Sequence, residues 1–306
     1  MPKNSRRDLE CLTRAIEAVA VHDGVFEVPV RGTVGVRYSS ASGFQNRRWR
    51  ACLALVAQGT KELVLGRTRY ALSAGHYTLT PLPLPLTSRI VDPPFICLLI
   101  GLDPMTLSSV VAEMDDRDEA AEGLQRGFFV GKVCERMRDA ALRLAQLFES
   151  HEAGAVLGPG CIRELLFHVL RGPNGPAIRQ FVHAGSEAHR IGAAVHQIES
   201  RLAERLDIEA LAADARVSRT LFFEQFKRVT SLSPLQYQKR LRLLEAQRLL
   251  VEEQTTAEEA AYRVGYQSPS QFSREYTRMH GEPPRYNAER LRGAARPPKV
   301  APKRLR

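Results

Sequence analysis

Hydrophobic and polar positions follow two different patterns along this chain. In residues 25–102, short β-branched and aliphatic runs recur at 34–38, 51–56, 62–65, 68–72, 76–80 and 95–100. Gly59, Gly66 and Gly75 lie between runs, where tight turns need a permissive backbone. Many short strands with regular breaks are typical of a β-sandwich or barrel. We therefore predict a β-rich N-terminal part.

The rest of the chain has apolar residues at helical spacing. The pattern predicts helices over 1–20, 104–114, 132–149 and 160–170. From about 177 to Asn287 nearly every segment is predicted to be helical. The Pro- and Lys/Arg-rich stretch 293–306 has little to bury, so we predict that it is disordered. Together these elements predict an α+β protein with an all-α C-terminal part.

Two segments of the helical part are similar to each other, Ala212–Arg228 and Ala261–Arg278. Each begins with a small residue that lets two helices approach, continues through a short turn, and ends in a helix. Each helix carries an aromatic pair at i and i+4, which places both rings on one face. The pairs are Phe222 with Phe226 and Phe272 with Tyr276. Each segment therefore predicts a helix-turn-helix unit.

Capping residues mark the predicted helix starts. Ser268-Pro269-Ser270-Gln271 places an N-cap, a proline at the first helical position and a glutamine three residues past the cap. Ser233–Gln236 repeats this arrangement, and Thr256–Glu259 is a capping box. Apolar residues within 234–252 predict a long helix between the two units. Two units held by a rigid helix could enter successive major grooves, which requires a separation of roughly 34 Å.

The stretch from about 190 to 292 resembles the DNA-binding domain of AraC-type transcription regulators. The matching residues are Ser233–Lys239, Val264–Tyr276, and Gly281 with Pro284. The chain departs from the family pattern at Ser231, which replaces a glycine, at Thr277, which replaces a basic residue that contacts phosphate, and at Arg216, which replaces a small turn residue. None of these departures is expected to break the fold.

The N-terminal part is similar to one subgroup of the same family. The similarity lies in 55–61, in the series Gly66, Tyr70, Gly75 and Tyr77, in 84–86 and in 163–172. The resemblance implies a cupin-like sandwich or barrel with a helical association segment over 1–185. It further implies a bihelical helix-turn-helix domain over 186–292, which leaves 293–306 as a basic tail.

The resemblance also assigns roles within the two recognition helices. Base reading is expected in the first unit at Thr220, Phe223 and Glu224, and in the second at Pro269, Ser270, Gln271 and Arg274. Arg274 is the strongest candidate, because bidentate arginine to guanine is the commonest specific contact. Phosphate contacts are expected from Ser218, Lys227, Arg228, Ser268 and Arg278. Solvated surface positions, or for Phe223 packing against Leu221, remain the alternatives.

Charge and overall composition agree with a DNA-binding protein. The net charge is +10, and residues 186–306 contain 22 Lys+Arg against 15 Asp+Glu. A basic excess in this part is expected if it binds a polyanion, although a solvated basic surface has the same composition. The sequence contains no apolar run of 18 residues, and its first residues do not resemble a signal peptide. We therefore expect a cytoplasmic protein that does not enter a membrane.

The sequence contains no pattern typical of an enzyme. The five cysteines form no CxxC, His76 has no second histidine at metal-binding spacing, and neither a nucleophile elbow nor a phosphate-binding glycine loop occurs. We predict no metal, no cofactor and no catalysis. Cys52 and Cys97 lie in apolar runs where thiols tend to be inert, which disfavours a redox or electrophile sensor.

The expected function is sequence-specific transcriptional regulation by a small-molecule effector, with double-stranded DNA and RNA polymerase as partners. Candidates for the effector pocket are Trp49, His76, Tyr77, Thr80 and Arg89, for which packing or surface exposure is the alternative. The apolar segment 160–170 could pair with a second copy in a homodimer or pack within the chain. An architectural DNA-binding protein would instead bind sequence-tolerantly, whereas a regulator should prefer its operator by roughly a thousandfold.

Overall fold

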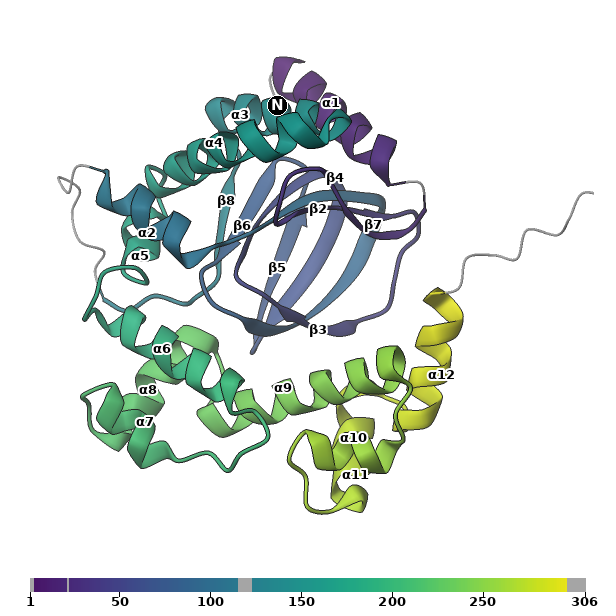
Figure 1. Ribbon diagram of the computed structural model, residues 1–306, viewed down its shortest axis with the longest axis vertical. Helices are drawn as coiled ribbons and strands as arrows, with labels where there is room; N and C mark the ends of the chain where they lie inside the picture. The colour runs from purple at the N-terminus through teal and green to yellow at the C-terminus, as the bar shows by residue number, and fades with distance from the viewer. Residues whose placement is uncertain (1–2, 21, 115–122, 296–306) are drawn as a thin grey trace, which may run out of the picture. The chain divides into compact units, whose positions relative to one another are not determined.

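A computed structural model describes residues 3–20, 22–114 and 123–295 of the chain (Figure 1). The chain divides into two compact units. The first comprises Met1–Gln197 with Asp207–Tyr237, and the second comprises Ile198–Leu206 with Gln238–Arg306. The first unit contains a β-sheet, the helices that cover it and one helix-turn-helix motif. The second unit contains the other helix-turn-helix motif.

An antiparallel sheet dominates the first unit, and eight strands of it lie within the described residues. They are β1 (Gly24–Glu27), β2 (Thr33–Tyr38), β3 (Gln45–Trp49), β4 (Cys52–Leu65), β5 (Thr68–Ser73), β6 (His76–Thr80), β7 (Leu84–Gly101) and β8 (Phe129–Lys132). The strand order is β1-β2-β7-β4-β6-β8, with β3 paired to β7 and β5 paired to β4. The predicted α+β class with a β-rich N-terminal part is therefore confirmed.

Two long strands, β4 and β7, organise the sheet. The beginning of β4 pairs with β6 and its end pairs with β5, while β7 runs beside it throughout. Register shifts between Val56 and Lys61 bend β4 between these two halves. Gly59 lies at the bend with φ +75°, and a Cβ there would stand 2.4 Å from the carbonyl oxygen of Pro94. The predicted strands 51–56 and 62–65 are therefore one bulged strand.

Helices cover one face of the sheet. In the N-terminal part they are α1 (Lys3–Val19), α2 (Pro104–Ala112), α3 (Glu135–Gln146), a 3-10 turn (Leu147–Glu149), α4 (His151–Leu170) and α5 (Gly175–Arg179). Helices α1, α3 and α4 lie along the same side of the sheet (Figure 1). Ile16 of α1, Leu53 of β4 and Leu165 of α4 are fully buried in the core between these layers.

Helix α4 is longer than the predicted helix 160–170. Its first half contains Gly154, Gly158 and Pro159, residues with low helix propensity. A Cβ on Gly154 would lie 2.1 Å from the carbonyl oxygen of Pro29, and one on Gly158 would lie 2.7 Å from Val30. The glycines therefore allow close packing on the segment before β2. Helix α4 is long and apolar enough to cross a membrane, but its Leu165 and Val169 side chains are buried in the core.

The remaining helices are α6 (Glu187–Ser200), α7 (Ile208–Asp214), α8 (Arg219–Thr230), α9 (Pro234–Arg248) with a π-helical turn (Leu249–Glu253), α10 (Ala257–Arg263), α11 (Pro269–His280) and α12 (Pro284–Ala295). In the second unit, the Arg242 guanidinium donates to the carbonyl oxygens of Leu202, Glu204 and Gly265 at 2.8, 2.7 and 3.0 Å. Helix α12 continues three residues into the predicted tail, of which 296–306 lie outside the described residues.

Candidate nucleic-acid interface

The first helix-turn-helix motif consists of α7, a four-residue turn and α8. Ser218 is the N-cap of α8, and its side chain accepts a hydrogen bond from the backbone nitrogen of Leu221 at 3.3 Å. Phe222 and Phe226 are fully buried, with ring centroids 5.7 Å apart, and the Phe226 ring meets Tyr237 edge-on. The core-facing aromatic pair predicted from i,i+4 spacing is confirmed, and it fixes which side of α8 faces outward.

The outward side of α8 carries the residues predicted to meet DNA. Thr220, Glu224, Lys227 and Arg228 are exposed, and so is the cap residue Ser218. Phe223 is half-buried, and its neighbour Leu221 is 41% exposed. Phe223 therefore both packs against the motif and retains surface that a base methyl group could contact.

The second motif repeats the design with α10 and α11. The Thr256 side chain caps α10 by accepting from the backbone nitrogen of Glu259 at 3.1 Å. Ser268 caps α11 by accepting from the backbone nitrogen of Gln271 at 3.3 Å, and Pro269 follows at the first helical position. Phe272 and Tyr276 are fully buried with ring centroids 5.5 Å apart. The predicted cap and proline position of α11 are thus confirmed.

The predicted contact residues lie on the opposite side of α11 from this aromatic pair. Ser270, Gln271, Arg274 and Arg278 are exposed, and Ser268 and Pro269 are half-buried at the start of the helix. The structure thus brings the base-reading and phosphate-contacting candidates of each motif together on the exposed side of one helix.

Four cations of the recognition helices have no partner for their side chains in the described part of the chain. Within the described residues, Lys227, Arg228, Arg274 and Arg278 make no ion pair or hydrogen bond through their side chains. Arg219 of α8, in contrast, pairs with Glu209 at 3.1 Å, and cations of other elements are also engaged. Arg248 pairs with Glu245 at 2.8 Å and Glu253 at 2.9 Å, and Arg263 pairs with Glu253 at 2.7 Å. The side chains of Lys227, Arg228, Arg274 and Arg278 are therefore available to an external anion.

Glu275 orients α11, and the sequence analysis did not single it out. Its carboxylate accepts from Tyr266 Oη at 2.8 Å and pairs with Lys239 Nζ of α9 at 2.6 Å. Burial alone would raise the pKa of Glu275, but hydrogen bonds from Lys239, Tyr266 and Gln271 outweigh burial and lower it. Glu275 follows Arg274 directly, so this network holds the exposed arginine's segment of the helix in place.

The turn of each motif and the C-cap of each recognition helix have left-handed backbone. Arg216 (φ 56°) lies in the turn of the first motif, and Gly265 (φ +87°) lies in the turn of the second. Ser231 (φ 62°) is the C-cap of α8, where the corresponding cap of α11 is Gly281 (φ +81°). Two departures from the family pattern, Arg216 and Ser231, thus place non-glycine residues in a region that favours glycine.

The five candidates for the effector pocket have separate surroundings. Tyr77 is buried in the core between sheet and helices, and Thr80 donates to the carbonyl oxygen of Leu82 at 2.6 Å. His76 Nδ1 lies 3.0 Å from the carbonyl oxygen of Ser73, and Arg89 pairs with Glu62 at 2.6 Å. Trp49 lies beside Lys61, whose Nζ is 5.1 Å from the Trp49 ring centroid. Lys61 was not among the residues predicted from the sequence.

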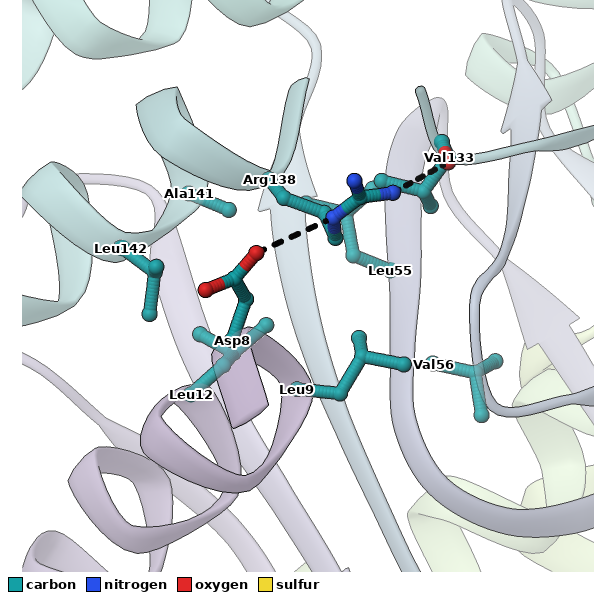
Figure 2. A pocket seen from close by; sticks show the side chains of 9 residues that line it. All are labelled: Asp8, Leu9, Leu12, Leu55, Val56, Val133, Arg138, Ala141 and Leu142. Atoms are coloured by element: carbon teal, nitrogen blue, oxygen red, sulfur yellow. Dashed lines mark hydrogen bonds and ion pairs between the residues drawn. The ribbon is translucent and has the colours of Figure 1, made fainter. Parts of the chain in front are cut away.

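A small hollow between α1, α3 and β4 is shown in Figure 2. Arg138 donates from Nε to Asp8 at 3.3 Å and from a terminal nitrogen to the carbonyl oxygen of Val133 at 3.3 Å. The other lining residues are Leu9, Leu12, Leu55, Val56, Ala141 and Leu142. Its volume is about 10 Å³, which is comparable to the space that one water molecule needs. This hollow is a packing gap between the helices and the sheet, and it is too small to hold an effector.

The buried thiols have the chemistry of core residues. Burial raises the pKa of Cys52 and of Cys97 to about 12 in each case. At neutral pH almost none of either thiol is therefore ionised, and the thiolate is the reactive form. Within the described residues, no group of three or more His, Cys, Asp or Glu side chains could hold a metal ion.

The sequence matches the profiles of two families, in this order along the chain. Residues 29–177 match a family described as "AraC-type transcriptional regulator N-terminus", and residues 211–289 match a helix-turn-helix domain family. The second match contains α8 and α11 with all their candidate contact residues. The chain belongs to the AraC-type transcriptional regulators.

Curated relatives of this AraC-type chain match it over about a hundred residues. The uncharacterized HTH-type transcriptional regulator YobQ of Bacillus subtilis (strain 168) is 35% identical over 106 residues, which are 35% of this chain and 44% of YobQ. The HTH-type transcriptional activator RhaS of Escherichia coli (strain SE11) is 29% identical over 100 residues, which are 33% of this chain and 36% of RhaS. Each match covers less than half of the relative's length.

Solved structures of ToxT from Vibrio cholerae share the fold over most of the AraC-type chain. Wild-type ToxT with bound unsaturated fatty acid (strain SCE256) has a TM-score of 0.56 at 12% identity, covering 87% of this chain and 95% of ToxT. ToxT from strain O395 has a TM-score of 0.53 at 13% identity, covering 85% of this chain and 98% of ToxT. At this identity the likeness shows the fold alone.

Proposed function

We propose that this chain is a sequence-specific DNA-binding transcription regulator, in which α8 and α11 read successive major grooves. One observation carries the proposal. Each recognition helix is capped at its N-terminus, anchored by a buried aromatic pair, and lined on its outer side by cations without partners in the described chain. A protein that binds phosphates and base edges needs this combination of rigidity and unsatisfied positive charge.

The proposal gives each exposed group a role. Arg274 reads a guanine through its two terminal nitrogens, while Pro269, Ser270 and Gln271 contact neighbouring bases. In the first motif Glu224 accepts from a cytosine amino group, and Thr220 and Phe223 pack on thymine methyl groups. Phosphates are bound by Ser218, Lys227, Arg228, Ser268 and Arg278, aided by the helix N-termini.

The remainder of the proposal concerns the whole chain. Residues 186–292 act as the DNA-binding domain, and residues 1–185 act as a sensory and association domain that binds a small-molecule effector and forms a homodimer. The fatty acid in ToxT, which has the same fold, supports an effector site in this domain. The chain acts in the cytoplasm on transcription by RNA polymerase and catalyses no reaction, as its membership in a regulator family supports.

Replacing Arg274 tests the reading role. We expect Arg274→Ala to weaken binding to the operator by roughly 1–3 kcal/mol while binding to unrelated DNA stays nearly constant, because a base contact contributes only to the correct sequence. The operator is identified first by genome-wide mapping of bound DNA, and affinities for both DNAs are then measured by gel-shift titration at fixed salt.

Two further variants serve as controls. Lys132→Ala removes the same charge from an exposed position of β8 and should leave both affinities unchanged. Lys227→Ala should weaken operator and unrelated DNA alike, because it removes a phosphate contact. Unchanged operator affinity in Arg274→Ala would rule out base reading by Arg274. Equal affinity of the wild type for operator and unrelated DNA would refute sequence-specific regulation and favour an architectural role.

A further inference from the structure

A lysine side chain reaches the apolar, aromatic interior beside β3, β4 and β7. The Lys61 ammonium lies 5.1 Å from the ring centroid of Trp49 and 5.5 Å from that of Phe95. Phe95 is buried, as is Leu72, the partner of Lys61 across the β4–β5 ladder. Phe128 extends this aromatic wall, with its ring centroid 6.5 Å from that of Trp49.

No carboxylate compensates this charge within the described residues. Burial, together with the positive charge of Arg47, lowers the pKa of Lys61 to about 8. The adjacent carboxylate, Glu62, is committed to ion pairs with Arg69 and Arg89, both at 2.6 Å. A pKa of about 8 still leaves the amine mostly protonated at pH 7. The chain therefore holds a positive charge in an apolar surrounding without a counter-ion.

Such an arrangement is costly unless an anion completes it. The two rings stabilise the ammonium only partly, because a cation–π contact replaces neither a carboxylate nor its hydrogen bonds. Lys61 and Trp49 both keep some exposure, so a ligand can reach the ammonium from solvent. The neighbouring rings of Trp49 and Phe95 suit the apolar body of such a ligand, and Arg47 adds a second positive charge nearby.

We infer that Lys61, between the rings of Trp49 and Phe95, is the anchor for the negatively charged group of the effector, a carboxylate carried on an apolar body. The inference rests on the proposed effector function of the N-terminal domain, and it assigns both the anchoring residue and the chemical class. Ligand binding supplies the missing counter-ion, and the apolar body packs against the surrounding rings.

The chain contains its own reporter of this site. Trp49 is the only tryptophan of the sequence, so intrinsic tryptophan fluorescence of the full chain reports on the surroundings of Lys61. We expect Trp49 emission to titrate with a midpoint near pH 8 in the wild type. The titration should vanish in Lys61→Met, which keeps the apolar stem without the charge. It should persist in the control Lys132→Met, which changes an exposed lysine of β8.

Binding is measured with decanoate and 1-decanol, which share a chain and differ in charge. We expect decanoate to change Trp49 emission saturably below its micelle concentration and to bind at least about tenfold more tightly than 1-decanol, since a charge-assisted contact is lost in the alcohol. Lys61→Met should weaken decanoate binding by a similar factor and leave 1-decanol unaffected. Lys132→Met should match the wild type. Bound decanoate should also raise the midpoint of the pH titration, because it prefers the protonated amine.

Several outcomes would overturn the inference. These are equal affinity for decanoate and 1-decanol, decanoate binding unaffected by Lys61→Met, or no saturable response to decanoate or to the aromatic acid 4-phenylbutanoate. All of these measurements are made without DNA. The operator affinity of the wild type without ligand is measured separately by gel shift, so failure of the effector site and failure of the proposed DNA-binding function remain distinguishable.

Discussion

At the scale of single residues, Gly265 connects backbone conformation to the position of a recognition helix. It lies in the turn between α10 and α11 with φ +87°, and a Cβ there would stand 2.1 Å from the carbonyl oxygen of Ala203. The turn therefore packs directly on the backbone of segment 198–206. The Gly265 carbonyl also accepts from Arg242 at 3.0 Å, so the start of α11 is fixed from two sides.

We expect Gly265→Ala to destabilise the second unit by at least about 3 kcal/mol, since it adds a backbone clash to the cost of about 1–2 kcal/mol for a left-handed alanine. Gly281→Ala is the matched control, because Gly281 has φ +81° but open space around its Cα. The Gly281→Ala variant should lose only the stability that a left-handed alanine costs, about 1–2 kcal/mol. Urea unfolding of both variants, followed by circular dichroism, measures the difference. Equal losses would show that the close approach to Ala203 contributes nothing.

The residues predicted correctly from the sequence are those whose role follows from their spacing along the chain. The aromatic pairs and the caps Thr256 and Ser268 follow from i,i+4 and i,i+3 relations, and all are found where predicted. Lys61 and Glu275 were missed for the opposite reason. Their partners come from other strands and helices, so each lysine or glutamate looked like an ordinary charged residue until the fold brought Trp49 and Phe95, or Lys239 and Tyr266, to it.

At the scale of elements, the long strands and α4 show what local patterns miss. The strand β4 was predicted as two runs, because its bulged middle breaks the alternation on which strand prediction depends. The strand β7 was predicted only over 95–100, since Pro85, Pro93 and Pro94 before this run argue against a central strand. Strands β1, β3 and β8 were not predicted, as four or five residues carry little periodicity.

Helix α4 presents an apolar surface that suits the proposed homodimer. Val156 and Leu157 are 71% and 56% exposed, and Phe167 is 37% exposed three turns further along the side of Val156. Arg163, which pairs with Glu113, lies between Val156 and Phe167 on this side, so the exposed apolar side chains do not form a continuous stripe. Exposed apolar side chains on a helix that is otherwise part of the core are nevertheless typical of an association surface. The buried and exposed halves of α4 thus explain why its sequence is apolar nearly all round.

Val156→Glu should therefore convert a dimer into a monomer, because a carboxylate cannot be buried without a partner. Ala155→Glu places the same charge on an exposed residue about 100° around the helix from Val156, and should leave the dimer intact. Sedimentation velocity of the full chain at several concentrations gives the oligomeric state. A wild type that stays monomeric, or equal behaviour of the two variants, would refute association through α4.

At the scale of the whole molecule, one chain carries two reading heads joined along the sequence by α9. This helix has 15 residues, which correspond to about 22 Å at 1.5 Å per residue. It runs without proline beyond its first turn and is held by Arg242 and Gln238 on segment 198–206. A helix of fixed length cannot lengthen by roughly 34 Å, which is the length of one turn of the DNA duplex. The spacing of the two half-sites is therefore expected to be as important as their sequences.

Inserting base pairs between the half-sites tests this coupling. Five added base pairs turn the second half-site to the opposite side of the duplex, and affinity should fall to that of a DNA with one half-site. Ten added base pairs return the second half-site to its original side of the duplex but increase the distance between the half-sites by roughly 34 Å. Affinity should therefore stay low if both reading heads belong to one chain. Recovery at ten base pairs would show that the half-sites are read by different chains of a dimer. Unchanged affinity in both DNAs would mean that a single head accounts for binding.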